Sequence, residues 1–346
     1  MTQPGDDADS AGWWIYTGSG RPQDGITRLP DAPPWRRFSG QPLFEPRFPP
    51  DDVAPRRLGA EERALTYQAS ETVVNMVNTA LYLRRPLLVT GKAGIGKSSL
   101  AYSIAYELGL GPVLNWPITS RSVLQDGLYR YDAIGRLQEA NIGQLAGQPP
   151  AGPDIGRFIR LGPLGAALLP QARPRVLLID ELDKSDIDLP NDLLHVFEEG
   201  SFDIPELARL PDTEDMVEVL GHDTVGGVPV YQGRITCQAF PVVVITSNGE
   251  RVFPAPFLRR CVRLEIAEPG RQALADIVAA HLGPQVAGES EAIIERFLER
   301  RAEGDIATDQ LLNAVYFATS GGHAPSRTRD QVAHELLRPL DSPFTR

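Results

Sequence analysis

Short apolar runs alternate with helical stretches through the middle of the chain. Five runs predict β-strands, at residues 86–90, 112–116, 175–180, 241–246 and 262–266. Apolar residues at helical spacing predict helices over residues 59–82 and 97–108. Because apolar strands alternate with helices, the pattern predicts an α/β fold, with a parallel five-stranded sheet that carries helices on both faces.

After residue 270 the pattern is helical only. Apolar side chains recur at helical spacing around Ile277, Phe297 and Leu312. We therefore expect an α/β domain at residues 61–268, followed by a small helical domain and C-terminal tail at residues 269–346.

Residues 1–60 are rich in Pro, Gly and Asp and also carry large aromatic side chains. These are Trp13, Trp14, Tyr16, Trp35 and Phe38. Solvated tails seldom hold so many tryptophans, so we interpret this region as a partly disordered arm that docks on the core or on a neighbouring subunit. The alternative is a mostly disordered leader.

Two segments between the predicted strands are longer than a minimal strand–helix unit requires. Residues 143–169 are rich in Gly and Pro and predict an inserted hairpin or loop. Residues 203–238 contain a turn signal at Gly226 and Gly227 and two strand-like runs, VPVY and RITC, which predict a hairpin. For both insertions a passive surface loop is the alternative.

Composition narrows the class of protein. The chain is 42% hydrophobic and 23% charged, as expected for a globular protein. Its net charge of −11 disfavours nucleic acid as the main partner, although a local basic groove can override that average. No apolar run is long enough for a membrane span, and we expect a cytoplasmic location. Cys237 and Cys261 form neither a disulfide framework nor a metal cluster.

The loop between the first predicted strand and the next helix carries the clearest chemical signal. Residues 91–98 read GKAGIGKS and match the phosphate-loop pattern at every fixed position. The candidate nucleotide-binding residues here are Gly91, Lys92, Ala93, Gly94, Ile95, Gly96, Lys97, Ser98 and Ser99. Backbone N–H groups of such a loop surround a phosphate, Lys97 reaches the β and γ phosphates, and the Ser98 hydroxyl binds Mg²⁺. We therefore expect ATP and Mg²⁺ as cofactors.

Polar residues follow two of the other apolar runs. The run at 175–180 ends in Asp180 and Glu181, and the run at 241–246 is followed by Asn248. At the carboxyl edge of a parallel sheet, Asp180 is expected to coordinate Mg²⁺ through water, and Glu181 to polarise the attacking water. Asn248 is suited to hydrogen-bond the γ-phosphate or to orient water, but it also fits a simple turn before Gly249.

Two adjacent arginines, Arg259 and Arg260, precede the last predicted strand. One interpretation is an ordinary surface pair. The other is an arginine finger that enters the site of a neighbouring subunit and stabilises charge on the transferred phosphoryl group.

Taken in order, the segments GKAGIGKS, LLIDELDK, VVITSN and FLRRC resemble the MoxR-like ATPases of the AAA+ P-loop superfamily. The resemblance covers roughly residues 60–320. It implies a sheet of strand order 5-1-4-3-2, a helical lid, and ATP bound between subunits of a hexameric ring. It also implies a protein substrate or a von Willebrand A-domain partner.

Carried over by position, the resemblance gives Asn248 the sensor 1 role and makes Arg260 the first candidate for the finger, with Arg259 in reserve. Sensor 2, usually a lid arginine, has no clear counterpart. The predicted helix at 308–317 has no Arg at its start, and Arg327 and Arg329 lie on the next segment.

The leading hypothesis is therefore a chaperone-like ATPase that remodels or assembles a protein partner. The intact Glu181 and the available arginines favour turnover. The alternative is a regulatory ATP-binding switch with slow hydrolysis, which the lack of a clear sensor 2 favours. A nucleic-acid translocase is a third hypothesis, which the acidic composition disfavours.

Overall fold

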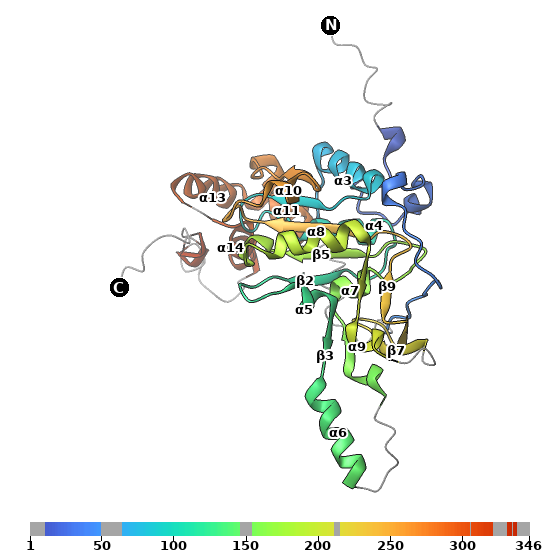
Figure 1. The fold of residues 1–346 in the computed structure, drawn as a ribbon. Helices are drawn as coiled ribbons and strands as arrows, with labels where there is room; N and C mark the ends of the chain where they lie inside the picture. Colours follow the sequence, from blue (N-terminus) through green and yellow to red (C-terminus); the bar gives the residue numbers. More distant parts are fainter. Residues whose placement is uncertain are drawn as a thin grey trace.

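A parallel five-stranded sheet forms the centre of the computed structural model (Figure 1). The structure describes residues 11–49, 64–145, 154–210, 215–304, 306–320, 331–333 and 335–337. The strands are β1 (Leu87–Thr90), β2 (Leu114–Pro117), β5 (Val176–Asp180), β10 (Val242–Ser247) and β11 (Val262–Glu265). They lie in the order β11-β1-β10-β5-β2, which confirms the expected 5-1-4-3-2 arrangement.

Strand β5 shows why this sheet is buried on both faces. Leu177 and Ile179 pack into the apolar cluster on one face, together with Leu193 of helix α8 (Leu189–Glu199). Val176 and Leu178 belong to the cluster on the other face. Since successive strand residues point to opposite faces, a continuous apolar run is what a doubly covered strand requires.

Two helices cover the second face. Helix α3 (Glu71–Leu83) and helix α4 (Ser99–Glu107) pack their apolar residues against the sheet. The predicted single helix over 59–82 is interrupted: residues 64–66 are helical, residues 67–70 are not, and α3 begins at Glu71. Ser70 is the N-cap of α3. Its hydroxyl accepts a hydrogen bond from the Val73 N–H, which fixes the start of the helix at Glu71. Residues 59–63 lie outside the described residues.

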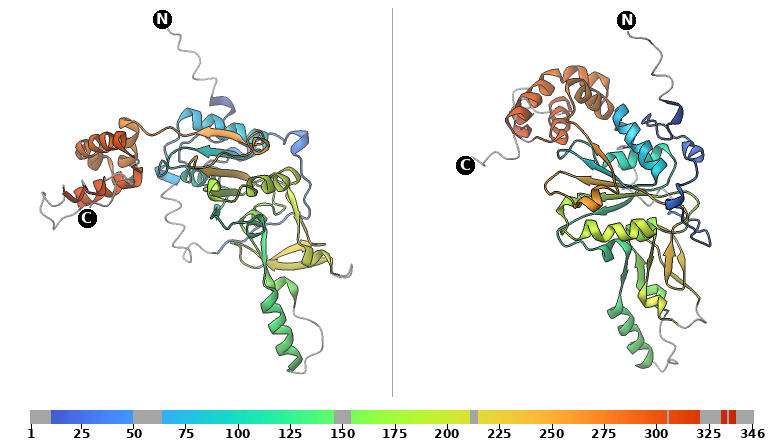
Figure 2. Two further views of the ribbon diagram at one scale, coloured as in Figure 1. Left: turned by 60° about the vertical axis from the view of Figure 1, so that its left-hand side comes forward. Right: turned by 45° about the horizontal axis from the view of Figure 1, so that its top comes forward.

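Strands from both expected insertions join in a second sheet, which also includes strands from before each of them. Its strands are β3 (Tyr129–Tyr131), β4 (Ile159–Leu161), β6 (Ser201–Asp203), β7 (Met216–Leu220), β8 (Gly227–Tyr231) and β9 (Arg234–Thr236). Strand β4, from the first insertion, pairs in parallel with β7, from the second. Helix α6 (Ala133–Leu145) follows β3 and projects away from the body of the molecule (Figure 2). Residues 146–153 of the first insertion lie outside the described chain.

Smaller helices complete the α/β core. Among them are α5 (Leu124–Leu128), α7 (Pro163–Ala167), α9 (Pro205–Ala208) and α10 (Ala255–Leu258), with 3-10 turns at Ile155–Phe158 and Leu182–Lys184. Helix α7 is entirely buried and packs against β2 and β5. Within the described residues, no helix has the length and apolar character needed to cross a membrane.

The C-terminal region is helical and has its own core. It contains α11 (Arg271–Leu282), α12 (Pro284–Glu289), α13 (Glu291–Glu303) and α14 (Thr308–Ser320). Leu274, Phe297 and Leu311 are fully or almost fully buried between these helices. Figure 2 shows this group of helices beside the α/β core, joined to it by the chain that leaves β11.

The first half of the N-terminal arm is anchored by buried polar side chains. Tyr16 is completely buried, and its hydroxyl lies 2.8 Å from the Ser103 hydroxyl of α4. Asn78 of α3 accepts the backbone N–H groups of Ile15 and Tyr16 at 2.7 and 3.0 Å, and donates to the Tyr16 carbonyl at 2.7 Å. Because these groups satisfy one another, the arm is fixed on the core.

The second half of the arm crosses to the other apolar cluster. Arg36 is buried and donates to the Phe197 carbonyl at 2.6 Å. The ring of Phe38 stacks on that of Phe240, with 5.7 Å between centroids, and the Gly40 N–H donates to the Cys237 carbonyl. The described part of the arm therefore docks on the core, as one of the two interpretations anticipated.

Substitution of Asn78 tests the anchoring of the arm. Asn78→Ala leaves two buried backbone N–H groups without an acceptor, so we expect the free energy of unfolding to fall by about 2–4 kcal/mol. Urea unfolding measures the change. Asn75→Ala is the matched control, because Asn75 holds the arm only through the partly buried Trp14 indole. An equal effect of the two substitutions would contradict the anchoring role of Asn78.

Candidate functional site

The loop between β1 and α4 adopts a backbone that depends on glycine. Gly91 has φ 149° and Gly94 has φ 74°, both in the region that side chains disfavour. A Cβ atom on Gly91 would lie 2.5 Å from the Ile95 side chain and 2.7 Å from the Ile266 carbonyl oxygen. The loop therefore curls tightly over the end of the sheet, and helix α4 starts directly after it at Ser99.

Lys97 occupies the centre of this loop and is only 6% exposed. Its ammonium group donates to the carbonyl oxygens of Gly91 and Lys92, at 2.8 and 2.6 Å, and to Asn248 Oδ1 at 2.7 Å. Burial lowers the pKa of Lys97, while the neighbouring carboxylates, Asp183 first, act in the opposite direction. The structure thus brings Lys97 and Asn248 together from segments 151 positions apart.

Ser98 and Asp180 also meet. The Ser98 hydroxyl donates to Asp180 Oδ1 at 2.6 Å. The Thr246 hydroxyl donates to the same oxygen at 2.7 Å and accepts the Glu181 N–H at 2.8 Å. A hydroxyl and a carboxylate are hard oxygen donors, and their distance suits them to share one Mg²⁺ ion. Together with Lys97, they form a compact polar group at the carboxyl edge of the sheet.

Thr246 was not among the candidates from the sequence. It is the fifth residue of β10, which pairs with β5 in parallel, so Ile245 lies opposite Ile179 and Thr246 lies beside Asp180. The sequence signal for Thr246 was its polar side chain within the otherwise apolar run of β10, which lies next to the strand that ends in Asp180. It could not be interpreted until the strand order was known.

Glu181 has a left-handed backbone, with φ 61° and ψ 50°. For a residue other than glycine this conformation costs about 1–3 kcal/mol, and such strain is concentrated at functional sites. Its carboxylate lies 2.6 Å from the Lys184 ammonium, and this hydrogen bond raises the pKa of Lys184. Among the described residues, no hydrogen bond or ion pair joins the Glu181 side chain to Lys97 or Ser98.

Asp183 is the second residue that the sequence did not reveal. It is 3% exposed, and its Oδ2 accepts the backbone N–H groups of Asn248 and Glu250 at 2.8 and 3.1 Å. These bonds fix the turn that directs Asn248 towards Lys97. The Asp183 Oδ1 atom is buried without a hydrogen-bond partner in the described chain.

Arg259 and Arg260 lie at the opposite edge of the sheet from the loop. They precede β11, and the Val262 N–H donates to the carbonyl of Pro86, which comes just before β1. The half-exposed Arg260 forms an ion pair with Glu198 of α8 at 2.5 Å. Because the glycine loop follows β1 and these arginines precede its neighbour, they do not reach Lys97 of the same chain.

The helical C-terminal region contacts the glycine loop directly. A Cβ atom on Gly94 would lie 2.6 Å from the Ala307 side chain, immediately before α14. Glu268 pairs with Lys92 of the loop at 2.9 Å and lies 3.7 Å from Arg301 of α13. The helical region is therefore packed against the loop and joined to it by ion pairs.

Two sensor 2 candidates, Arg327 and Arg329, lie outside the described residues. Helix α14 itself (Thr308–Ser320) contains no arginine. The structure therefore brings no arginine of that helix to the loop.

Comparison with known proteins finds only distant structural similarity. No family model matches the sequence, and the curated proteins also give no match. Among solved structures, three variants of Thermotoga maritima RuvB align with it at 14, 13 and 12% identity. The alignments cover 79, 83 and 83% of this chain and 71, 70 and 70% of those chains, with TM-scores of 0.42, 0.37 and 0.38. Similarity this low does not indicate a function for this chain.

Asp183 provides a test of this geometry. Asp183→Ala removes the acceptor of two backbone N–H groups, so we expect a loss of about 2–4 kcal/mol in the free energy of unfolding. We also expect faster amide exchange at residues 248–250, measured by hydrogen–deuterium exchange. Asp183→Asn is the control because it retains an acceptor oxygen. Unchanged exchange in Asp183→Ala would show that other contacts hold the turn.

Proposed function

We propose that this chain is a Mg²⁺-dependent ATPase of the AAA+ type. The observation that carries the proposal is the meeting of Ser98 and Asp180, 2.6 Å apart, beside the buried Lys97 ammonium. A cation, a hydroxyl and a carboxylate converge next to a glycine loop and a helix N-terminus. This combination suits a magnesium-bound triphosphate, because each charged part of the ligand has a partner of opposite charge.

The loop residues bind the phosphates. Backbone N–H groups of residues 91–99 surround the phosphate oxygens, and the Lys97 ammonium exchanges its carbonyl contacts for the β and γ phosphates. Ser98 would hold Mg²⁺ directly and Asp180 through water, and the ion would supply positive charge to offset the charge that develops on the phosphates. Thr246 orients the Asp180 carboxylate for this task through the hydrogen bond to Oδ1.

Glu181 is the proposed general base. The left-handed backbone places its carboxylate beyond the end of β5, where it accepts a hydrogen bond from Lys184. Polarisation of the attacking water requires the carboxylate to leave Lys184 and turn towards the γ-phosphate. Asn248, held by Asp183 and already bonded to Lys97, contacts the same phosphate and senses its loss.

Arg260 is the proposed finger, and it acts on a neighbouring subunit. Its position at the edge of the sheet opposite Lys97 supports action in trans rather than within one chain. We therefore propose a homo-oligomeric ring, hexameric by resemblance, whose ATP cycle remodels a protein partner. The MoxR-like character and a von Willebrand A-domain partner rest on the sequence resemblance alone.

Glu181→Gln tests the catalytic assignment. The amide cannot accept the proton of the attacking water, so we expect turnover to fall by about 10²-fold or more while ATP still binds. Steady-state phosphate release and equilibrium binding of ATP measure the two properties separately. Lys97→Ala is the contrasting variant, since it should lose binding itself. Normal turnover by Glu181→Gln would remove Glu181 from the mechanism.

Mixing two inactive variants tests the shared site. Arg260→Ala keeps the glycine loop but lacks the proposed arginine finger. Lys97→Ala keeps the finger but is expected not to bind ATP. If Arg260 acts in trans, mixed oligomers contain competent sites, and we expect the mixture to hydrolyse ATP faster than either variant alone. The readout is phosphate release as a function of the mixing ratio.

Glu198→Gln is the control for this experiment, because it breaks the same ion pair but keeps the guanidinium. Arg259→Ala distinguishes the two adjacent arginines. No gain on mixing, together with full activity of Arg260→Ala alone, would exclude the finger. A wild-type rate per subunit that is slow and independent of protein concentration would favour the ATP-switch alternative.

A further inference from the structure

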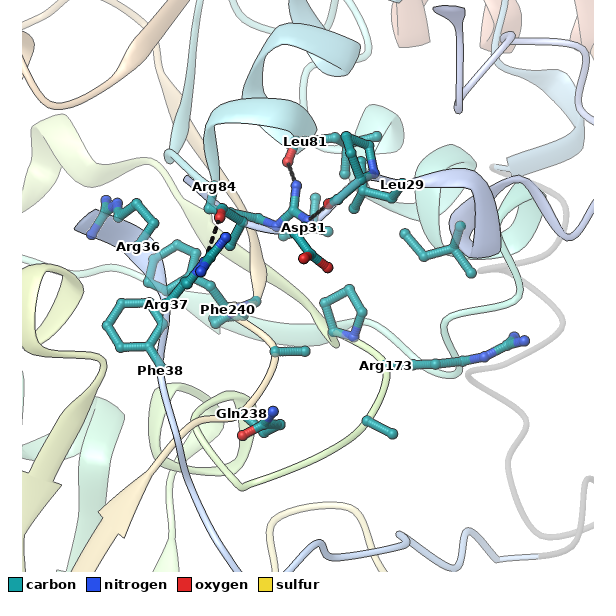
Figure 3. A pocket seen from close by; sticks show the side chains of 18 of the residues that line it. Leu29, Asp31, Arg36, Arg37, Phe38, Leu81, Arg84, Arg173, Gln238 and Phe240 are labelled. Atoms are coloured by element: carbon teal, nitrogen blue, oxygen red, sulfur yellow. Dashed lines mark hydrogen bonds between the residues drawn. The ribbon is translucent and has the colours of Figure 1, made fainter. Parts of the chain in front are cut away.

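A pocket of about 700 Å³ lies between the N-terminal arm and the α/β core, at the edge of the sheet opposite the candidate ATP site (Figure 3). Its walls include Arg84, Pro174 and Pro241, which directly precede or lie close to the starts of β1, β5 and β10. Lys97 lies in the loop beyond the other end of β1, and Asp180 is the last residue of β5. The pocket is therefore separate from the ATP site.

The lining is strongly basic in an acidic protein. Five of its 21 residues are arginines, against a single carboxylate, Asp31. The arginines are Arg36, Arg37, Arg84, Arg85 and Arg173. Since Lys and Arg make up only 34 of 346 residues and the net charge is −11, this gathering of positive charge is local. We call this cavity the arginine pocket.

Most of this charge has no carboxylate partner. Arg173 pairs with Asp24 at 3.0 Å. Among the described residues, no ion pair joins Arg36, Arg37, Arg84 or Arg85 to an acid; Asp31 and Glu198 act on Arg84 and Arg36 only at longer range. Burial of these two guanidinium groups lowers the pKa of each. The pocket thus holds an excess of positive charge that an anionic ligand would neutralise.

Carbonyl oxygens hold the guanidinium groups in place without neutralising them. Arg84 donates to the carbonyls of Leu81 and Pro30, both at 2.5 Å, and its backbone is left-handed, with φ 51°. Arg37 donates to the Ala32 carbonyl at 3.2 Å. Each guanidinium has five N–H donors, so several remain available for a ligand.

The wall supplied by the arm is firmly attached. Gly40 lies so close to the strand below it that a Cβ atom would come within 1.9 Å of the Thr236 carbonyl oxygen. The buried Arg36 is fixed to the Phe197 carbonyl and lies over the Phe240 ring, 4.9 Å from its centroid. The pocket is consequently formed before any ligand arrives, which reduces the ordering cost of binding.

We propose that the arginine pocket binds an acidic peptide segment of a protein partner. Its volume is within the range for organic ligands and far exceeds that of one phosphate ion. Figure 3 shows the cations spread along the pocket: Arg36 and Arg37 lie near one end, Arg84 in the middle, and Arg173 at the other end. Spaced cations match spaced carboxylates along an extended chain better than they match a single compact anion.

Apolar side chains complete the match. Phe38 and Phe240 lie beside Arg36 and Arg37 at one end, and Leu29 and Leu81 lie beside Arg84. An acidic segment that alternates carboxylate and aliphatic side chains would place both kinds of group against suitable partners. Because the pocket is separate from the candidate ATP site, its test needs no nucleotide and does not depend on the proposed hydrolysis.

The test uses a fluorescein-labelled eight-residue peptide of alternating Glu and Leu, with the full chain and no nucleotide. Fluorescence anisotropy measures the dissociation constant. We expect Arg37→Gln and Arg173→Gln each to weaken binding by about tenfold, because each removes one charge-assisted contact. Both side chains are exposed, so thermal unfolding should be unchanged. Binding should also weaken as NaCl is raised.

Matched controls separate specific binding from general attraction. Arg21→Gln removes one exposed arginine of the arm outside the pocket and should alter binding less than twofold. A Gln–Leu peptide of the same length should not bind. Equal binding of the Gln–Leu peptide, or an equal loss with Arg21→Gln, would overturn the proposal. Binding of inorganic phosphate without the Glu–Leu peptide would overturn it in favour of a simple anion site.

Discussion

The Asp180 carboxylate holds the candidate site together. One of its oxygens accepts two hydroxyl donors, Ser98 from the glycine loop and Thr246 from β10. Three separate segments therefore meet at one atom, at the edge where parallel strands end. This arrangement requires β5 to lie beside β10 in the observed register, so the apolar packing of the sheet fixes the polar chemistry at its end.

The neighbouring contacts extend this arrangement in two directions. Asp183 fixes the turn that presents Asn248 to Lys97, so the end of β5 controls two residues of the site as well as Asp180. In the other direction, Glu268 connects Lys92 of the loop to Arg301 of the helical region. These ion pairs connect the glycine loop to the C-terminal helices.

The N-terminal arm has two physical roles. Its first part replaces solvent around buried polar groups of α3 and α4, such as Asn78 and Glu107. Its second part closes one side of the arginine pocket, next to Phe240. The core alone would expose both surfaces, so the arm, although largely irregular in structure, belongs to the folded unit.

Sequence alone predicted the five strands of the central sheet and, through the family resemblance, their order, because apolar periodicity is a local signal. The glycine spacing and the strand ends also made Lys97, Ser98, Asp180 and Asn248 candidates for one site. It joined two helical segments before β1 into one helix, because the break at residues 67–70, which ends at the Ser70 cap, interrupts an otherwise continuous apolar stripe. Only the tertiary structure revealed Thr246, Asp183 and the arginine pocket. These depend on which segments become neighbours after folding, and side chains far apart in the chain leave no common pattern in the sequence.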